Sequence, residues 1–210
     1  MTTRRKQLTE EMKAGIRSAA AALFADKGFA AVTMREIAKA AGCSHTAIYL
    51  YFKNKEDLLQ QIAIPPLKEM EAAMLGRMAD PSASQIDRLL AVCREFAVFC
   101  LTKGSFYHVL ITPGAVRIDE KEPVLEVNQI RNRLFGHLND ALSDAVGDGA
   151  ARVDPAKALN HGRMLFYYMQ GYVNTYIGSE EPTAALLERT LPIYYDGIRI
   201  FVAGIQQSIR

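Results

Sequence analysis

The stretch TMREIAKAAGCSHTAIYLYFKNK, residues 33–55, decides how the N-terminal part of the chain folds. Thr33 and Glu36 stand three residues apart in the order of a capping box, which predicts the first turn of a short helix. Gly42 follows that helix and supplies the positive φ that a tight turn requires. Ser44 is a suitable N-cap for a second helix. The stretch therefore predicts two short helices joined by a tight turn.

A longer helix is predicted ahead of this pair, over residues 10–27, because apolar residues recur there at the helical period. The second short helix is expected to run to about residue 52. The expected shared core consists of Ile37, Ala41, Cys43, Ile48 and Phe52. Three helices with these lengths and this turn have the dimensions of a helix-turn-helix.

Positive charge is concentrated in the first 55 residues. They contain ten Lys or Arg against four Asp or Glu, a net of +6, whereas the whole chain carries +2, so the remainder carries −4. A basic head on an acidic body is expected when only one part of a protein meets phosphate. A chance gradient of charge is the alternative reading.

The second short helix offers a face suited to reading bases. Thr46, Ala47 and Leu50 point away from its apolar stripe on a helical projection, and His45 and Tyr49 flank it. Hydroxyl groups form hydrogen bonds with base edges, and Ala or Leu meets the methyl group of thymine. This face is therefore expected to enter the major groove of DNA.

Residues 24–59 read FADKGFAAVTMREIAKAAGCSHTAIYLYFKNKEDLL. This stretch resembles the DNA-binding signature of the TetR (tetracycline-repressor-like) family, and the resemblance covers roughly residues 10–59 without a gap. Cys43 stands where the family commonly has valine. A conservative core replacement and a redox switch are the two readings of that cysteine.

The resemblance implies roles for particular positions. Arg35 would reach a phosphate or a base edge, and the backbone N–H groups near Thr33 form an anion site at a helix N-terminus. Phosphates would be held by Thr33, Tyr49, Tyr51 and Lys55. The full set of candidate DNA-binding residues is Thr33, Arg35, Ser44, His45, Thr46, Ala47, Tyr49, Leu50, Tyr51 and Lys55.

Every long segment after residue 55 is predicted to be helical. The expected ranges are 55–78, 81–102, 104–112, 122–146, 155–178 and 183–208, with Asp80-Pro81 and Asp154-Pro155 each read as an N-cap followed by proline. No stretch alternates polar and apolar residues as a strand does. The expected fold is all-α: a three-helix helix-turn-helix domain at 1–55, then a larger helical ligand-binding and dimerisation domain at 56–210.

The last two expected helices, 155–178 and 183–208, are apolar on nearly all sides, so more than one side of each must be covered. In the TetR family these helices pair with those of a second subunit, which implies a homodimer here. Closure of the chain's own core is the alternative. Pro192 should kink or split the last helix.

The helices predicted between the DNA-binding domain and the last two helices are rich in methionine and aromatic residues. This composition suits a flexible, apolar ligand pocket. In similar proteins this region surrounds a cavity, so we expect a small lipophilic or aromatic effector. The candidate pocket residues are Met70, Met74, Phe96, Phe99, Tyr107, His108, Leu110, Met164 and Tyr168. Polar anchors for the ligand could come from His108, His137, Asn160, His161, Arg163 or Gln170, with no single one preferred.

Pro65-Pro66 lies inside the helix expected at 55–78 and should kink or break it. In the family this helix links the head to the ligand body. The dipeptide is either an ordinary bend or a hinge between sensor and head.

Several classes of protein are disfavoured. No apolar run is long enough to span a bilayer, and no signal peptide opens the chain, so a cytoplasmic protein is expected. The three cysteines lack metal-ligand spacing, and Cys93 and Cys100 are too far apart on one helix for a disulfide. No metal, no cofactor and no enzymatic activity are expected, because phosphate-loop, nucleophile-elbow and metalloprotease motifs are missing.

The sequence thus favours a homodimeric repressor that binds a palindromic operator in double-stranded DNA and is released by a small molecule. An activator or a ligand-independent DNA-binding factor of the same fold is the alternative. A helical enzyme with a vestigial head is a more distant one. The effector, the operator and the regulated genes stay open.

Overall fold

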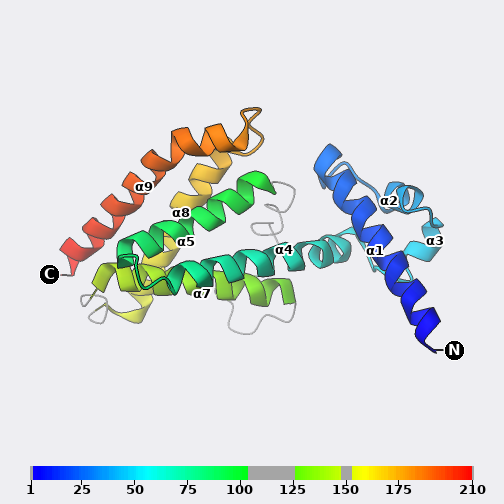
Figure 1. The fold of residues 1–210 in the computed structure, drawn as a ribbon, viewed down its shortest axis with the longest axis horizontal. Coiled ribbons are helices and arrows are strands. Elements are labelled where there is room, and N and C mark those ends of the chain that lie inside the picture. The colour runs from blue at the N-terminus through cyan, green and yellow to red at the C-terminus, as the bar shows by residue number, and fades with distance from the viewer. Residues whose placement is uncertain (1, 104–125, 148–152, 210) are drawn as a thin grey trace. The chain divides into compact units, whose positions relative to one another are not determined.

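A computed structural model describes residues 2–103, 126–147 and 153–209 of the chain (Figure 1). Every regular element in these ranges is a helix, so the expected all-α fold is confirmed. The helix expected at 104–112 lies outside the described residues. Contacts divide the chain into two compact units, the first reaching Pro66 and the second beginning at Leu67.

The first unit contains three helices that precede α4 (Figure 1). They are α1 (Thr2–Lys27), α2 (Met34–Ala40) and α3 (His45–Ile48). Their fully buried apolar side chains are Ile16, Ala20, Phe24, Ile37, Ile48 and, after α3, Phe52. The expected core is thus confirmed for Ile37, Ile48 and Phe52, whereas Ala41 and Cys43 are only half-buried.

The predicted caps and the predicted turn are confirmed. Thr33 Oγ1 accepts a hydrogen bond from the Glu36 N–H at 3.3 Å, and Glu36 Oε2 accepts one from the Thr33 N–H at 2.9 Å. Gly42 has a φ of +69°, in the left-handed region that favours glycine. Ser44 Oγ accepts a hydrogen bond from the Ala47 N–H at 3.0 Å and so caps α3.

Two predicted boundaries in this unit are wrong. α3 ends at Ile48, because the N–H groups of Leu50 and Tyr51 bond to carbonyls only three residues back, at 3.1 Å each, in a tighter turn. α1 begins at Thr2 rather than at residue 10. Arg4, Lys6 and Gln7 near its start are polar and exposed, so hydrophobic periodicity carries no signal there.

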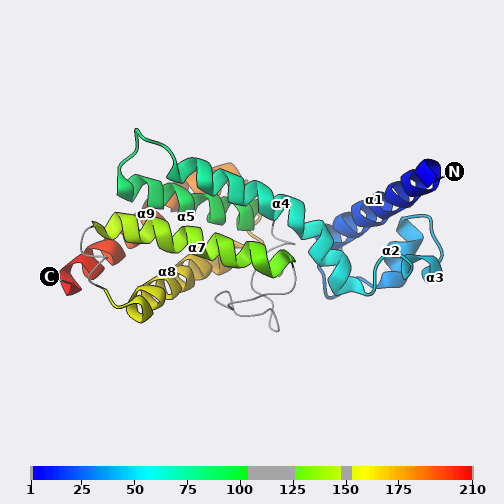
Figure 2. The same ribbon diagram turned by 90° about the horizontal axis from the view of Figure 1, so that it is seen from below.

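The second unit is a bundle built from the later part of α4 (Lys55–Met78) and four further helices. These are α5 (Gln85–Thr102), α7 (Glu126–Val146), α8 (Pro155–Tyr176) and α9 (Thr183–Ser208). α5 and α7 lie side by side, and both contact α8 and α9 (Figure 2). The predicted ranges of α4 and α9 are confirmed, and α8 ends two residues earlier than predicted.

The two predicted aspartate–proline starts have different outcomes. Asp154 Oδ1 accepts a hydrogen bond from the Ala156 N–H at 2.9 Å, which confirms it as the N-cap of α8. Asp80 instead accepts from the Ser82 N–H at 2.9 Å, within the turn that joins α4 to α5. Ser84 is the true N-cap of α5, so the predicted start at residue 81 is wrong.

Tyr194, on α9, contacts both α5 and α8 in the second unit. Its side chain is 1% exposed, and its hydroxyl donates to the carbonyl oxygen of Cys93 on α5 at 3.2 Å. The ring of Tyr168, on α8, stacks on it with 5.6 Å between centroids, and the Tyr168 hydroxyl donates to the Tyr194 carbonyl at 3.1 Å. A Cβ at Gly197 would lie 2.1 Å from that hydroxyl, so a residue without a side chain is required there.

The prolines do not interrupt their helices. Pro65 and Pro66 lie inside α4, and Pro192 lies inside α9. The alternative of a break at these positions is therefore wrong, and the alternative of a kink stays a prediction. Each proline removes one N–H and its ring crowds the carbonyl four residues back, but helices of 24 and 26 residues retain enough hydrogen bonds on both sides to continue.

The turn at Gly42 generates a stability prediction. Gly42→Ala should lower the free energy of unfolding by about 1 kcal/mol, because an L-residue is strained at positive φ. Gly76→Ala is the matched control: it lies in α4 with open space around a new Cβ, and alanine should raise stability there by about 1 kcal/mol. Urea unfolding followed by circular dichroism measures both changes. Equal effects of the two substitutions would contradict the assignment of strain to Gly42.

Candidate nucleic-acid interface

α3 and the turn after it present a row of exposed side chains around a buried anchor. Ile48 is fully buried, while His45, Thr46, Tyr49 and Leu50 are exposed and Ala47 is half-buried. Among the described residues, no large apolar side chain is more exposed than Leu50, at 79%. Apolar surface displayed in this way suits contact with a partner.

The side chains of this row differ in how firmly they are held. The rings of His45 and Tyr49 meet edge to face, with 5.3 Å between centroids, so each limits the rotamers of the other. The Ser44 hydroxyl oxygen already accepts the capping bond from Ala47. Tyr51 is half-buried beside Phe52, which lies in the core.

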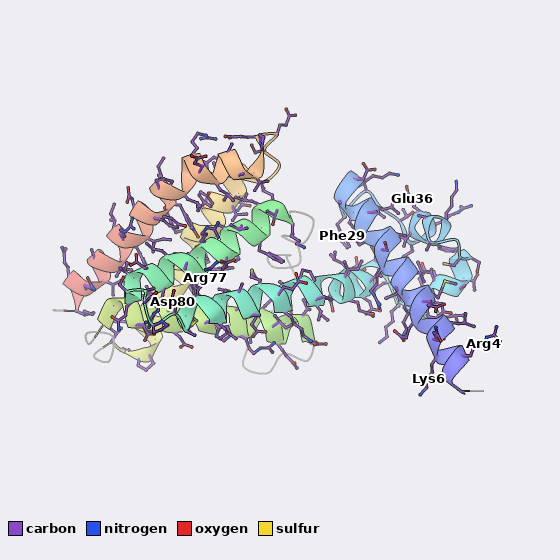
Figure 3. All side chains as sticks on the ribbon, in the orientation of Figure 1. Arg4, Lys6, Phe29, Glu36, Arg77 and Asp80 are labelled. Carbon is purple, nitrogen blue, oxygen red and sulfur yellow. The ribbon has the colours of Figure 1, made fainter. Side chains whose placement is uncertain are left out.

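The start of α2 carries a small polar network (Figure 3). Besides the capping box, the Thr33 hydroxyl donates to Glu36 Oε2 at 2.9 Å, and Lys27 Nζ donates to Glu36 Oε1 at 3.3 Å. The hydrogen bonds from the backbone and hydroxyl of Thr33, with that from Lys27, hold the pKa of Glu36 below its usual value. Arg35, one residue earlier, is exposed.

The ammonium group of Lys55 is bonded within the protein, unlike that of an exposed phosphate ligand. Its ammonium donates to the carbonyl oxygens of Phe29 at 2.8 Å, Val32 at 2.9 Å and Ala30 at 3.4 Å. It also lies 4.3 Å from the centroid of the Phe29 ring. Lys55 is the first residue of α4, and its side chain is therefore hydrogen-bonded to the loop between α1 and α2.

Exposed basic side chains accompany this surface in the first unit. Among the described residues they are Arg4, Lys6, Lys27, Arg35, Lys39 and Lys53. Arg4 and Lys6 lie near the N-terminal end of α1 (Figure 3). Charges of this kind are what a sequence-independent attraction to DNA phosphates requires.

The candidate pocket residues of the body fall into three groups. Met70, Met74, Phe96 and Phe99 are buried, with 2–7% exposure. Met164 and Tyr168 are 54% and 39% exposed on α8, so they lie at the surface and not in the buried interior. Tyr107, His108 and Leu110 lie outside the described residues.

An aromatic cluster joins three helices of the body. The Phe166 ring on α8 meets Phe96 of α5 and Phe135 of α7 edge to face, at centroid distances of 5.7 and 6.1 Å. Only Phe96 was among the candidate pocket residues. The cluster belongs to the apolar interior that the methionine and aromatic content predicts.

The sequence reading missed two buried polar residues on α7. Arg131 is 6% exposed and Asn128 is 5% exposed, and Arg131 Nη1 donates to Asn128 Oδ1 at 3.1 Å. Burial lowers the pKa of Arg131 below its usual value. A helical projection of α7 could have found both, because they share the buried face with Ile130 and Leu134.

Ion pairs attach the later part of α4 to α7. Arg133 donates to both carboxylate oxygens of Glu71, at 2.6 and 2.9 Å, and His137 Nε2 lies 3.4 Å from Glu71 Oε1. Hydrogen bonding from Arg133 lowers the pKa of Glu71. Lys68 and Glu126 form a further pair at 2.6 Å. His137, a candidate ligand anchor, is thus engaged by α4.

Other kinds of site were sought within the same ranges. No group of three or more His, Cys, Asp or Glu in the described part of the chain is arranged to hold a metal ion. None of the helices found there combines the length and apolar character needed to cross a membrane.

Comparisons with known proteins agree with this geometry. Residues 16–62 match the family model of bacterial regulatory proteins, tetR family. The fatty acid metabolism regulator protein of Bacillus subtilis is 27% identical over 185 residues, covering 86% of this chain and 92% of its own. The transcriptional repressor KstR2 of Mycolicibacterium smegmatis is 27% identical over 139 residues, covering 64% of this chain and 65% of its own.

Solved structures show the same fold. The TetR-family regulator PfmR of Thermus thermophilus has a TM-score of 0.63 at 25% identity, covering 86% of this chain and 94% of its own. FadR of Bacillus subtilis, solved in complex with stearoyl-CoA, has a TM-score of 0.53 at 22% identity, covering 87% and 97%. The helix-turn-helix geometry and the family match over residues 16–62 thus identify a DNA-binding domain of the TetR family, and over most of its length the chain is similar to transcriptional regulators of that family.

Proposed function

We propose that the protein is a homodimeric repressor that binds a palindromic operator and is released by a small lipophilic effector. The observation that carries the DNA-binding part is the exposed row on α3 and its following turn, held outward by the buried Ile48. Residues 1–55 form the proposed DNA-binding domain and 56–210 the proposed ligand-binding and dimerisation domain. A regulator of chromosomal genes would work in the cytoplasm.

The proposed contacts with DNA divide by chemistry. Thr46, Ala47 and Leu50 would meet base edges and thymine methyl groups, with His45 and Tyr49 beside them. Arg35 is exposed next to the start of α2 and would reach a phosphate or a base edge. Hydroxyl groups in the same segment would meet the backbone, which fixes register without reading sequence.

Exposed apolar surface on the last two helices supports the homodimer. Ile193 and Ile200 lie one heptad apart on α9 and are 72% and 73% exposed. Tyr167 and Met164 on α8 are 63% and 54% exposed. A second copy that covers these side chains would bury them as a four-helix interface, and two heads would then read two half-sites.

The proposed effector is a long-chain acyl-CoA or a similar amphiphile. The body has a buried methionine and aromatic interior suited to an acyl chain, and the relatives include a fatty acid metabolism regulator and a FadR solved with stearoyl-CoA. The buried Arg131 would pair with an anionic group of the ligand. Repression is proposed because KstR2 is named a repressor.

The base-reading role of Leu50 gives the first test. Leu50→Ala should weaken binding to the operator about ten-fold while leaving binding to unrelated DNA unchanged, because it removes a base contact and no charge. Leu8→Ala, which truncates a leucine that is 58% exposed on α1, is the matched control and should change neither. Fluorescence anisotropy measures both affinities. An equal loss on operator and unrelated DNA would contradict base reading.

The dimer gives the second test. Ile193→Asp should convert the protein to a monomer, since a carboxylate would be buried without a partner in the interface. Leu75→Asp places the same charge at an apolar residue that is 46% exposed on α4 and should leave the dimer intact. Sedimentation equilibrium distinguishes the two species. A dimer that survives Ile193→Asp would contradict the proposed interface.

The effector gives the third test. Stearoyl-CoA should raise the Kd for operator DNA by between about 5- and 150-fold, the range typical of allosteric coupling. Acetyl-CoA shares the nucleotide but lacks the long chain and should have little effect. Anisotropy titrations at constant salt measure the shift. If neither thioester changes the Kd, the proposed effector class is wrong.

A further inference from the structure

Lys55 is the first residue of α4, the helix that begins in the first unit and continues into the second. By its place in the family signature it would hold a phosphate. An ammonium group has three N–H donors and accepts nothing. Three carbonyl oxygens, those of Phe29, Ala30 and Val32, lie 2.8–3.4 Å from Lys55 Nζ and use these donors.

The loop that Lys55 binds is the one that places α2. Val32 is 1% exposed and directly precedes Thr33, the N-cap of α2. Phe29 packs against Phe24 of α1, with 5.3 Å between ring centroids, and its ring also faces the Lys55 ammonium. The cation therefore fixes the backbone between the end of α1 and the start of α2.

We propose that Lys55 is a positioning residue for DNA binding rather than a phosphate ligand. Its ammonium holds the loop 29–32 so that Thr33 and Arg35 are presented correctly, and it makes the start of α2 follow the first turn of α4. Any effector-driven displacement of α4 would then reach α2 through Lys55. The proposal rests on the DNA-binding function proposed above.

Lys55→Met removes the ammonium and keeps an unbranched stem near Phe29. In the free protein, hydrogen exchange of the backbone amides at 33–37 should become about ten-fold faster, the effect of losing a hydrogen-bonded tether. Protection of α5, α7, α8 and α9 should not change. Lys53→Met is the matched control, because it removes one exposed positive charge two residues earlier. This measurement needs no DNA, so it stays informative even if the proposed function fails.

Operator binding over a series of salt concentrations distinguishes a positioning role of Lys55 from a phosphate contact. Lys55→Met should weaken binding about ten-fold with the salt slope of the wild-type protein, whereas loss of a phosphate contact makes the slope shallower by about 0.9. Lys55→Arg should not restore affinity, because a planar guanidinium cannot direct three donors at these carbonyls, although it would still bind phosphate.

Faster exchange confined to 33–37, together with no rescue by arginine, is the expected result. Unchanged exchange with a shallower salt slope would overturn the proposal in favour of a phosphate contact. A loss of protection spread over the whole chain would overturn it in favour of a general role in stability. Wild-type exchange and affinity in Lys55→Met would overturn it as well.

Discussion

The burial of Ile48 is the constraint on which the proposed DNA-binding surface depends. α3 has only four residues, so a single side chain in the core sets the rotation of the whole helix. With Ile48 inward, the helical period directs its neighbours outward, which explains why Leu50 is so exposed. The positive φ of Gly42 and the Ser44 cap place α3 against α2 so that Ile48 can reach the core. The packing of α3 and the exposure of the proposed recognition surface are therefore set by the same few residues.

α4 begins in the first unit and continues in the second. At its start, Lys55 holds the loop before α2, and further along Glu71 and Lys68 pair with residues of α7. The helix continues through both prolines, so no break separates these contacts.

Local features were predictable from the sequence, and long-range ones were not. The capping box at Thr33, the Gly42 turn and the Ser44 cap depend on neighbouring residues alone, and all three are confirmed. The end of α3 is set by the tighter turn in which the N–H groups of Leu50 and Tyr51 bond three residues back, and the apolar pattern, which continues to Phe52, does not predict that turn. The pairing of Glu71 with Arg133 joins residues 62 apart, and the three carbonyls around Lys55 lie 23–26 residues away. A pattern within one helix carries no signal for such contacts.

The central claim, specific DNA binding by residues 33–55, is tested most directly by titrating the purified protein onto DNA from upstream of its own gene, over a series of salt concentrations. We predict a two-fold symmetric footprint, an affinity at least about 10³-fold above that for a shuffled duplex, and a logarithm of affinity that falls linearly with the logarithm of salt concentration. Equal affinity for the shuffled duplex, or no binding even at low salt, would contradict the account.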